Sequence, residues 1–203
     1  MEYRLTARTL YLGERMKGSI FKPCIKTIPF SQISGALNAR FGLDNVKAVG
    51  CLVDDPGFNK DNYLVYAPRD RGSAISRLPL QAGYLSDVLG KVYVLMEEKS
   101  TGGFPGKFEL VLGGLRSRGF GACTMERVQV LHVLPRRDMG PGILNVRIPI
   151  EEQETFSLIK VIRPIYGYLF KPTPGTLSGN YVLSLFEGSE VVAPLFLLKD
   201  TRR

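Results

Sequence analysis

The chain has 203 residues, a length that suits one large domain or two small packed lobes. Apolar residues make up 44% and charged residues 23%, which is ordinary for a globular protein and excludes a largely disordered one. No apolar run approaches the ~18–20 residues that span a bilayer, and the N-terminal residues interrupt their apolar side chains with charge. We therefore expect neither a transmembrane segment nor a signal peptide.

The three cysteines, Cys24, Cys51 and Cys123, are odd in number and widely separated. They build neither a disulfide framework nor a Cys-x-x-Cys metal site, so we expect small buried thiols in a reducing, cytoplasmic environment. Two pairs of adjacent carboxylates, at 54–55 and 151–152, have no histidine or third carboxylate at a useful spacing. The sequence therefore predicts no metal and no cofactor.

The charge balance is basic, with 27 lysines and arginines against 19 acidic residues and a net charge of +8. Two segments carry the excess: residues 1–47 hold 8 basic and 3 acidic side chains, and residues 112–148 hold 6 and 2. Two basic segments on a near-neutral body indicate a surface for an anionic partner, most often nucleic acid. Scattered, solvated cations are the alternative.

The pattern of apolar residues predicts one helix and many strands. The helix spans residues 31–41, with Ser31 as its cap, one apolar face and Gly42 as its stop. Elsewhere 22 glycines and 13 prolines interrupt the chain at short intervals. We expect strands at 3–12, 46–53, 63–66, 88–96, 107–112, 122–134, 144–150, 156–162, 166–170, 181–186 and 191–198.

This pattern predicts an α+β fold with antiparallel sheets. Residues 88–96 and 107–112 flank a Ser-Thr-Gly-Gly turn and are expected to form a hairpin, as are residues 181–186 and 191–198. The order of elements favours a ferredoxin-like (RRM-like) antiparallel core with β-hairpin insertions. A loop near residue 135 divides the expected core domain, 1–134, from a β-rich C-terminal lobe, 135–203.

A glycine-rich segment between two predicted strands carries most of the functional signal. Its nine residues are Gly113-Gly114-Leu115-Arg116-Ser117-Arg118-Gly119-Phe120-Gly121. Glycines permit left-handed backbone angles and a close approach of the main chain to a ligand. Loop amides can hold an anion, arginines add bidentate phosphate contacts, and an aromatic ring can stack on a base. The segment therefore indicates binding to single-stranded nucleic acid.

Other glycine-rich motifs explain this segment less well. Gly114 and Gly119 have the glycine spacing of a nucleotide-binding P-loop, but Phe120 and Gly121 stand where lysine and serine or threonine are required. The spacing of a dinucleotide-binding Gly-x-Gly-x-x-Gly also does not match. A plain turn between two strands, with solvated arginines, stays open as the alternative.

Two segments resemble the CRISPR-associated RAMP superfamily. Residues 112–121 are similar to the glycine-rich loop of that superfamily. The other segment is similar to a pattern in which an Ile-Pro-Gly-Ser turn leads into a helix with Gly-Ala-Leu. Phe30 stands at the position of that glycine. The segment consists of Thr27-Ile28-Pro29-Phe30-Ser31-Gln32-Ile33-Ser34-Gly35-Ala36-Leu37.

The resemblance implies a guide-RNA (crRNA) binding subunit of a CRISPR effector ribonucleoprotein, most like the small subunit that caps the repeat-derived 5′ handle. Its partners would be guide RNA, other effector subunits and, through the complex, target nucleic acid. A repeating backbone subunit, with a thumb hairpin at 84–96 or 58–66, is an alternative. By resemblance, guide-RNA phosphates would contact Gly113, Gly114, Arg116, Ser117, Arg118, Gly119 and Gly121.

Further basic side chains extend the expected RNA-binding surface. Phe120 is predicted to stack on a base. Asp70 lies between Arg69 and Arg71 and can pair with these two arginines instead of leaving them to phosphates. The added residues are Lys22, Lys26, Arg69, Arg71, Arg136 and Arg137.

His132 is the only histidine. In a strand it would lie on the face opposite Leu131 and Val133. A metal-independent endoribonuclease that processes precursor guide RNA would use it as general base. A packed strand residue is the ordinary explanation, so we expect no catalytic residue unless the protein is such an enzyme.

Overall fold

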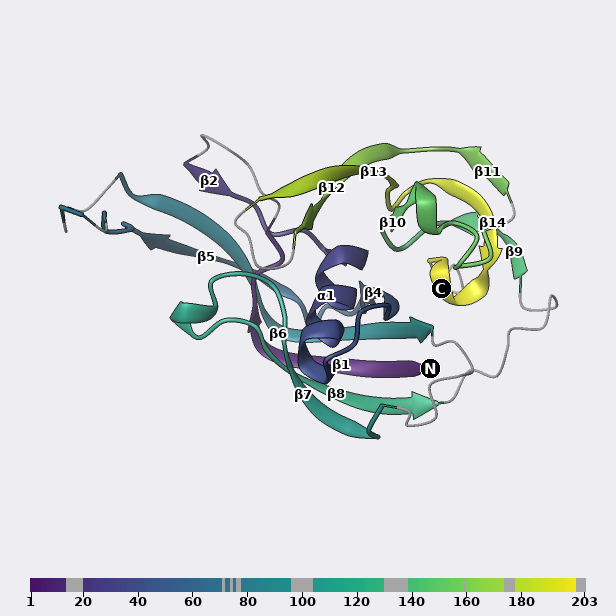
Figure 1. The fold of residues 1–203 in the computed structure, drawn as a ribbon, viewed down its shortest axis with the longest axis horizontal. Coiled ribbons are helices and arrows are strands. Elements are labelled where there is room, and N and C mark those ends of the chain that lie inside the picture. The colour runs from purple at the N-terminus through teal and green to yellow at the C-terminus, as the bar shows by residue number, and fades with distance from the viewer. Residues whose placement is uncertain are drawn as a thin grey trace.

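The computed structural model describes residues 1–13, 20–70, 72–73, 75, 78–95, 104–129, 139–158, 160–173 and 178–199. These residues form mostly antiparallel sheets with one α-helix, which confirms a β-rich α+β fold (Figure 1). Among them, no helix is long and apolar enough to cross a membrane.

The large sheet is built around the central strand β6. Its main path has the order β3-β4-β6-β1-β8-β7, while β2 and β5 pair with β6 beside that path. All pairs are antiparallel except β2 with β6. The strands are β1 (Glu2–Leu10), β2 (Phe21–Lys22), β3 (Thr27–Ile28), β4 (Lys47–Leu52), β5 (Lys60–Tyr66), β6 (Leu80–Leu95), β7 (Lys107–Val111) and β8 (Ala122–Gln129).

Helix α1 (Phe30–Phe41) covers one face of this sheet (Figure 1). Ile33 and Leu37 lie one turn apart on its buried side, and each fully buried aliphatic side chain contributes about 1.5–3 kcal/mol. The helix begins one residue earlier than expected, and Ser31 is not its cap: Pro29 occupies the cap position without a side-chain hydrogen bond. Gly42 ends the helix in a left-handed conformation, as predicted.

The chain after residue 139 forms two three-stranded sheets, β10-β13-β12 and β11-β14-β9. They pack against the second face of β4 and β6, because Val49 and Tyr93 share a buried cluster with Phe156 and Leu185. The expected boundary at 134/135 lies outside the described residues. The strands are β9 (Met139–Ile143), β10 (Ile148–Pro149), β11 (Lys160–Arg163), β12 (Tyr166–Pro172), β13 (Gly179–Leu185) and β14 (Glu190–Pro194).

Both predicted hairpins are wrong in their pairing. β6 does not pair with β7, because β1 and β4 occupy its two edges; β7 pairs with β8 instead. β13 pairs with β12, whereas β14 belongs to the other small sheet. The chain leaves β13 at a bend where Gly188 has a φ of 93° and the Ser189 hydroxyl donates to the Phe186 carbonyl. Only a short part of the expected strand at 144–150 is present, as β10.

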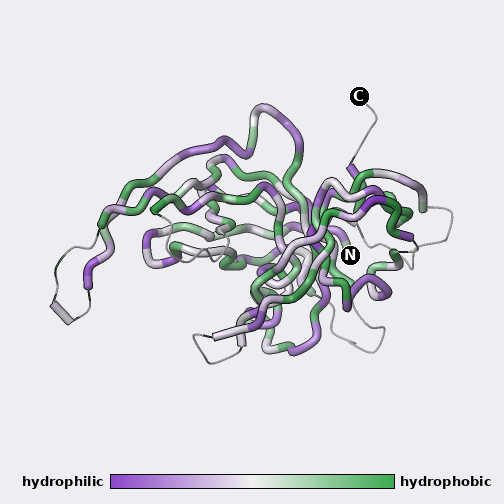
Figure 2. The backbone as a smooth tube through the Cα atoms, turned by 90° about the horizontal axis from the view of Figure 1, so that it is seen from above, coloured by the Kyte–Doolittle hydropathy of each residue, from purple (hydrophilic) through white to green (hydrophobic). Residues whose placement is uncertain are grey.

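Strand β5 and the first half of β6 form an arm that projects from the body of the molecule (Figures 1 and 2). The arm carries exposed apolar side chains, among them Tyr63 and Val65 of β5. Figure 2 shows hydrophobic and hydrophilic residues alternating along it, which is the pattern of a strand pair with two different faces.

Candidate nucleic-acid interface

The glycine-rich segment forms the loop of the β7–β8 hairpin. At its centre lies a 3₁₀ turn, η1 (Arg116–Arg118), between Leu115 at φ 55° and Gly119 at φ 82°. The residues from Arg116 to Gly119 are exposed, whereas Leu112 and Gly121 at the base are buried. The loop therefore has a packed base and an exposed tip.

Glycines at the base are required by close packing within the protein. A Cβ at Gly113 would lie 2.2 Å from the Tyr11 carbonyl oxygen, and one at Gly121 would lie 2.2 Å from the Leu112 carbonyl oxygen. A Cβ at Gly114 would lie 2.9 Å from the Tyr11 ring. At Gly119 an added Cβ would meet no atom within 4 Å, so only its φ favours glycine. Gly113 and Gly114 thus pack against Tyr11, just beyond β1, and Gly121 packs against the base of the loop itself.

Four amides of the loop donate hydrogen bonds to carbonyl oxygens of the protein itself. Gly114 donates to the Tyr11 carbonyl and Gly121 donates to the Thr9 carbonyl, at 3.0 and 3.1 Å. Arg118 and Gly119 donate to carbonyls within the loop itself. These amides anchor the loop, so the guanidinium groups at its tip are its main outward-facing donors.

Arg116 and Arg118 lie on opposite sides of this tip. The Arg116 Nε donates to the Gly113 carbonyl at 3.0 Å, which holds the side chain along the loop. The Arg118 guanidinium lies 4.1 Å from the centre of the Tyr66 ring, a cation–π contact at the end of β5. In the described part of the chain, neither arginine forms a salt bridge with a carboxylate.

Phe120, which is predicted to stack on a base, is half-buried. Its ring packs edge-on against Tyr84 of β6, with 4.9 Å between the ring centres. This contact and the stacking of Arg118 on Tyr66 tie the loop to the projecting arm. Stacking of Phe120 on a base stays a prediction.

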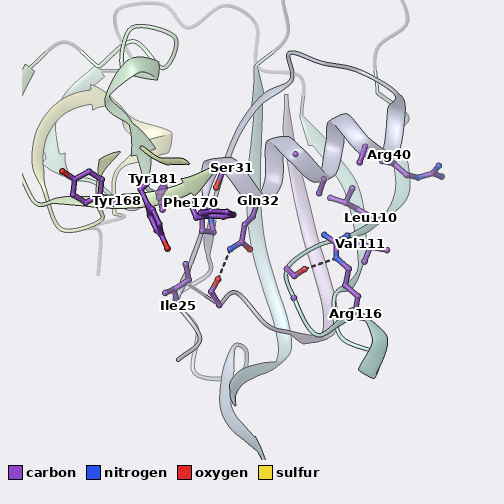
Figure 3. A pocket seen from close by; sticks show the side chains of 18 residues that line it. Ile25, Ser31, Gln32, Arg40, Leu110, Val111, Arg116, Tyr168, Phe170 and Tyr181 are labelled. Atoms are coloured by element: carbon purple, nitrogen blue, oxygen red, sulfur yellow. Dashed lines mark hydrogen bonds between the residues drawn. The ribbon is translucent and has the colours of Figure 1, made fainter. Parts of the chain in front are cut away.

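A cleft of about 650 Å³ opens on the other side of the loop (Figure 3). One wall is the loop and the end of β7, with Gly113 and Arg116; the floor is the small-residue side of α1, with Gly35 and Ala39. Arg40 lines the end of the cleft, but its guanidinium points away from the aromatic rings (Figure 3), and its Nε donates to the Glu109 carbonyl. Among the described residues, the lining holds these two arginines and no carboxylate.

The opposite wall of the cleft is aromatic and comes from β12 and β13 (Figure 3). Tyr168 and Phe170 lie two residues apart on one face of β12, and Tyr181 is the cross-strand partner of Phe170. The Phe170 and Tyr181 rings lie 5.5 Å apart, and Tyr168 and Tyr181 are 64% and 52% exposed. Our sequence analysis missed this wall, although the spacing Tyr166-x-Tyr168-x-Phe170 is visible in the sequence.

Gln32 of α1 marks the inner end of the cleft. Its Nε2 donates to the Gly13 carbonyl at 3.3 Å, which joins the helix to the end of the first strand segment (Figure 3). Its Oε1 is buried and accepts no hydrogen bond from the described residues. An unpaired buried acceptor carries a desolvation cost of about 1–3 kcal/mol.

The other predicted RNA-binding residues are dispersed. Lys26 is exposed and pairs with Asp61 at 2.6 Å, and Lys22 lies in β2 beside the arm. Arg69 is exposed just beyond β5, and the Asp70 carboxylate accepts from the amides of the following turn. The four remaining predicted residues lie outside the described part of the chain: Arg71, His132, Arg136 and Arg137.

The cysteine thiols are poor nucleophiles in this fold. Burial raises the pKa of Cys51 and of Cys24 to about 11, and that of Cys123 to about 12. Cys51 and Cys123 are buried, as expected, whereas Cys24 is only half-buried. No cluster of three metal-ligating side chains occurs among the described residues.

Comparisons with known proteins identify the fold but no close relative. No protein-family model and no curated protein sequence matches the chain. The fold is similar to a chain of the type III-B Cmr-β complex bound to cognate target RNA and AMPPnP, with a TM-score of 0.60 and 8% identity over 95% of this chain and 86% of that chain. A chain of the same complex bound to cognate target RNA gives 0.60 and 9% identity over the same shares. At these identities the likeness shows a shared fold.

Proposed function

We propose that this protein is a non-catalytic guide-RNA binding subunit of a cytoplasmic CRISPR effector ribonucleoprotein, and that it holds the repeat-derived 5′ handle. The observation that carries the proposal is the exposed tip of the glycine-rich loop. Its two guanidinium groups have no carboxylate partner in the described chain, and they stand on a base that packing holds rigid. Preorganised arginines of this kind suit bidentate contacts with phosphates.

The fold supports the proposal. Chains with this fold belong to a Cmr-β complex that binds target RNA. The strand order β4-β6-β1-β8 also follows the order of a ferredoxin-like sheet, with α1 between β1 and β4. A ferredoxin-like core followed by a separate C-terminal lobe is therefore part of the proposal, with guide RNA and other effector subunits as partners.

Salt-dependent RNA binding tests the proposed site. Each phosphate contact with single-stranded nucleic acid contributes about 0.7 to the slope of log affinity against log salt. The R116A/R118A double variant is therefore expected to bind guide RNA more weakly and to lower that slope by about 1.4. The matched control is K160A/K199A, which removes two exposed charges far from the loop. Equal slopes for the two double variants would refute the proposed site.

The projecting arm favours one second candidate, a repeating backbone subunit of the same complex. β5 and the outer half of β6 include parts of both segments that we considered for a thumb hairpin. The number of copies of this chain in the assembled ribonucleoprotein separates the two roles. One copy per guide RNA supports the subunit that caps the handle, whereas several copies support the repeating subunit.

A further inference from the structure

The cleft beside the glycine-rich loop combines two chemistries on facing walls. One wall presents Arg116, and the other wall presents the rings of Phe170 and Tyr181 (Figure 3). A nucleotide has the same division, because its phosphate is anionic and its base has an apolar π-face. The rings are also held in place: they lie opposite each other in the β12–β13 register, with 5.5 Å between their centres.

We infer that this cleft binds one unstacked nucleobase of the RNA strand whose phosphates lie on the loop. The base stacks on the Phe170–Tyr181 wall, and the neighbouring phosphate lies toward the Arg116 guanidinium. This inference rests on the proposed function and adds a base-binding subsite to it. Stacking on aromatic rings accepts any base, which suits a site that holds a strand without selecting one sequence.

The dimensions and charge of the cleft favour this occupant. Its volume of about 650 Å³ lies within the ~300–1,000 Å³ of typical small-ligand sites. The small side chains of α1 leave the floor open, since an added Cβ at Gly35 would meet no atom within 4 Å. The Arg116 guanidinium, with no carboxylate in the described lining, matches a phosphate and would repel a basic peptide.

The test replaces the rings but keeps the apolar bulk. F170L/Y181L removes the π-faces, and Y166L is the matched control because Tyr166 is exposed on the same strand outside the cleft. The probes are short single-stranded RNAs that are identical except for one abasic nucleotide at successive positions. Wild-type protein should lose about 5- to 150-fold in affinity for one of these RNAs, the range expected for one stacked base.

The F170L/Y181L variant should bind intact RNA as weakly as the wild type binds that abasic RNA, and should lose nothing further with it. Wild-type affinity of F170L/Y181L for intact RNA would overturn the inference. So would normal RNA binding combined with failure to assemble with other subunits, since the wall would then be a protein-docking surface. The salt slope of R116A/R118A reports on the proposed function separately, because the ring substitutions remove no charge.

A second variant approaches the cleft from the helix and leaves both rings in place. Gly35 is exposed on α1 and lines the cleft, so the leucine side chain of Gly35→Leu would enter the cleft. It should reproduce the affinity loss of F170L/Y181L and the same insensitivity to the abasic position. Full affinity of Gly35→Leu for the intact RNA would contradict an occupied cleft.

Discussion

The glycine-rich loop and the β12–β13 hairpin face each other across one cleft but differ in how the sequence encodes them (Figure 3). The loop is nine consecutive residues whose spacing is informative by itself. The aromatic wall joins residues from two strands, and Phe170 meets Tyr181 only through the register of the pair. A cationic, locally encoded element is thus opposed by an aromatic element that exists only in the folded protein.

The two regions are also stabilised differently. Main-chain packing holds the loop, because its basal glycines contact carbonyl oxygens of the protein itself. The hairpin ends beside a nearly buried ion pair, in which the Arg147 guanidinium donates twice to the Glu187 carboxylate and stacks on Phe186. The loop should therefore be sensitive to backbone substitutions and the hairpin to loss of charge.

The largest expected effect is the loss of that carboxylate. Glu187→Ala removes the carboxylate that accepts two hydrogen bonds from the buried Arg147 guanidinium and should reduce the free energy of unfolding by about 3–5 kcal/mol. The control is Glu190→Ala, because its pair with the exposed Arg163 at 3.4 Å is worth less than about 1 kcal/mol. Urea unfolding measures both. Equal losses would show that the hairpin does not depend on the buried pair.

Glycine substitutions in the loop should give the next largest effect. Gly113→Ala combines left-handed strain with a contact to the Tyr11 carbonyl, so we expect a loss of about 2–5 kcal/mol. Gly119→Ala has the strain without the contact and should lose about 1–2 kcal/mol. Urea unfolding of the two variants gives the comparison. A loss at Gly119→Ala as large as at Gly113→Ala would contradict the division of the loop into packed base and exposed tip.

The buried thiols should make the stability of the protein depend on pH. Cys123 lies under the loop and Cys51 lies in the cluster shared with the C-terminal sheets. Their pKa values of about 12 and 11 exceed the value of about 9 for an unfolded thiol, so unfolding releases protons and stability should fall as pH rises above 9. The expected loss is about 1 kcal/mol per thiol at pH 10.

Urea midpoints at pH 8 and pH 10 measure this loss. A C51A/C123A variant should lose less stability over the same interval than the wild type does. The same midpoint shift in both proteins would mean that the thiols ionise freely in the folded state.

The smallest expected effect concerns the floor of the cleft. Gly35→Ala replaces an exposed helical glycine with a better helix former and should stabilise the protein by up to about 1 kcal/mol. A single methyl group should leave RNA affinity unchanged, in contrast to Gly35→Leu. Thermal unfolding and RNA titration check the two effects, and a large affinity loss for Gly35→Ala would show that the floor touches RNA directly.

The outcome of the sequence analysis follows the same contrast between local and long-range signals. The helix, its stop at Gly42 and the position of the loop between two strands were predictable, because turn residues and apolar periodicity are local. The pairing of β7 and of β13 was not predictable, since it is decided by contacts between strands. β7 pairs with β8 instead of β6, and β13 pairs with β12 instead of β14. The structural role of Gly113 and Gly121 was also hidden, because it depends on contacts with β1 and with the loop's own base.

The most direct test of the central claim is ultraviolet crosslinking of the RNA that co-purifies with the assembled complex, followed by identification of the modified peptides. The claim predicts adducts in the glycine-rich loop around Arg116 and in the β12–β13 hairpin around Phe170. Adducts confined to other surfaces, with both of these peptides unmodified, would contradict it.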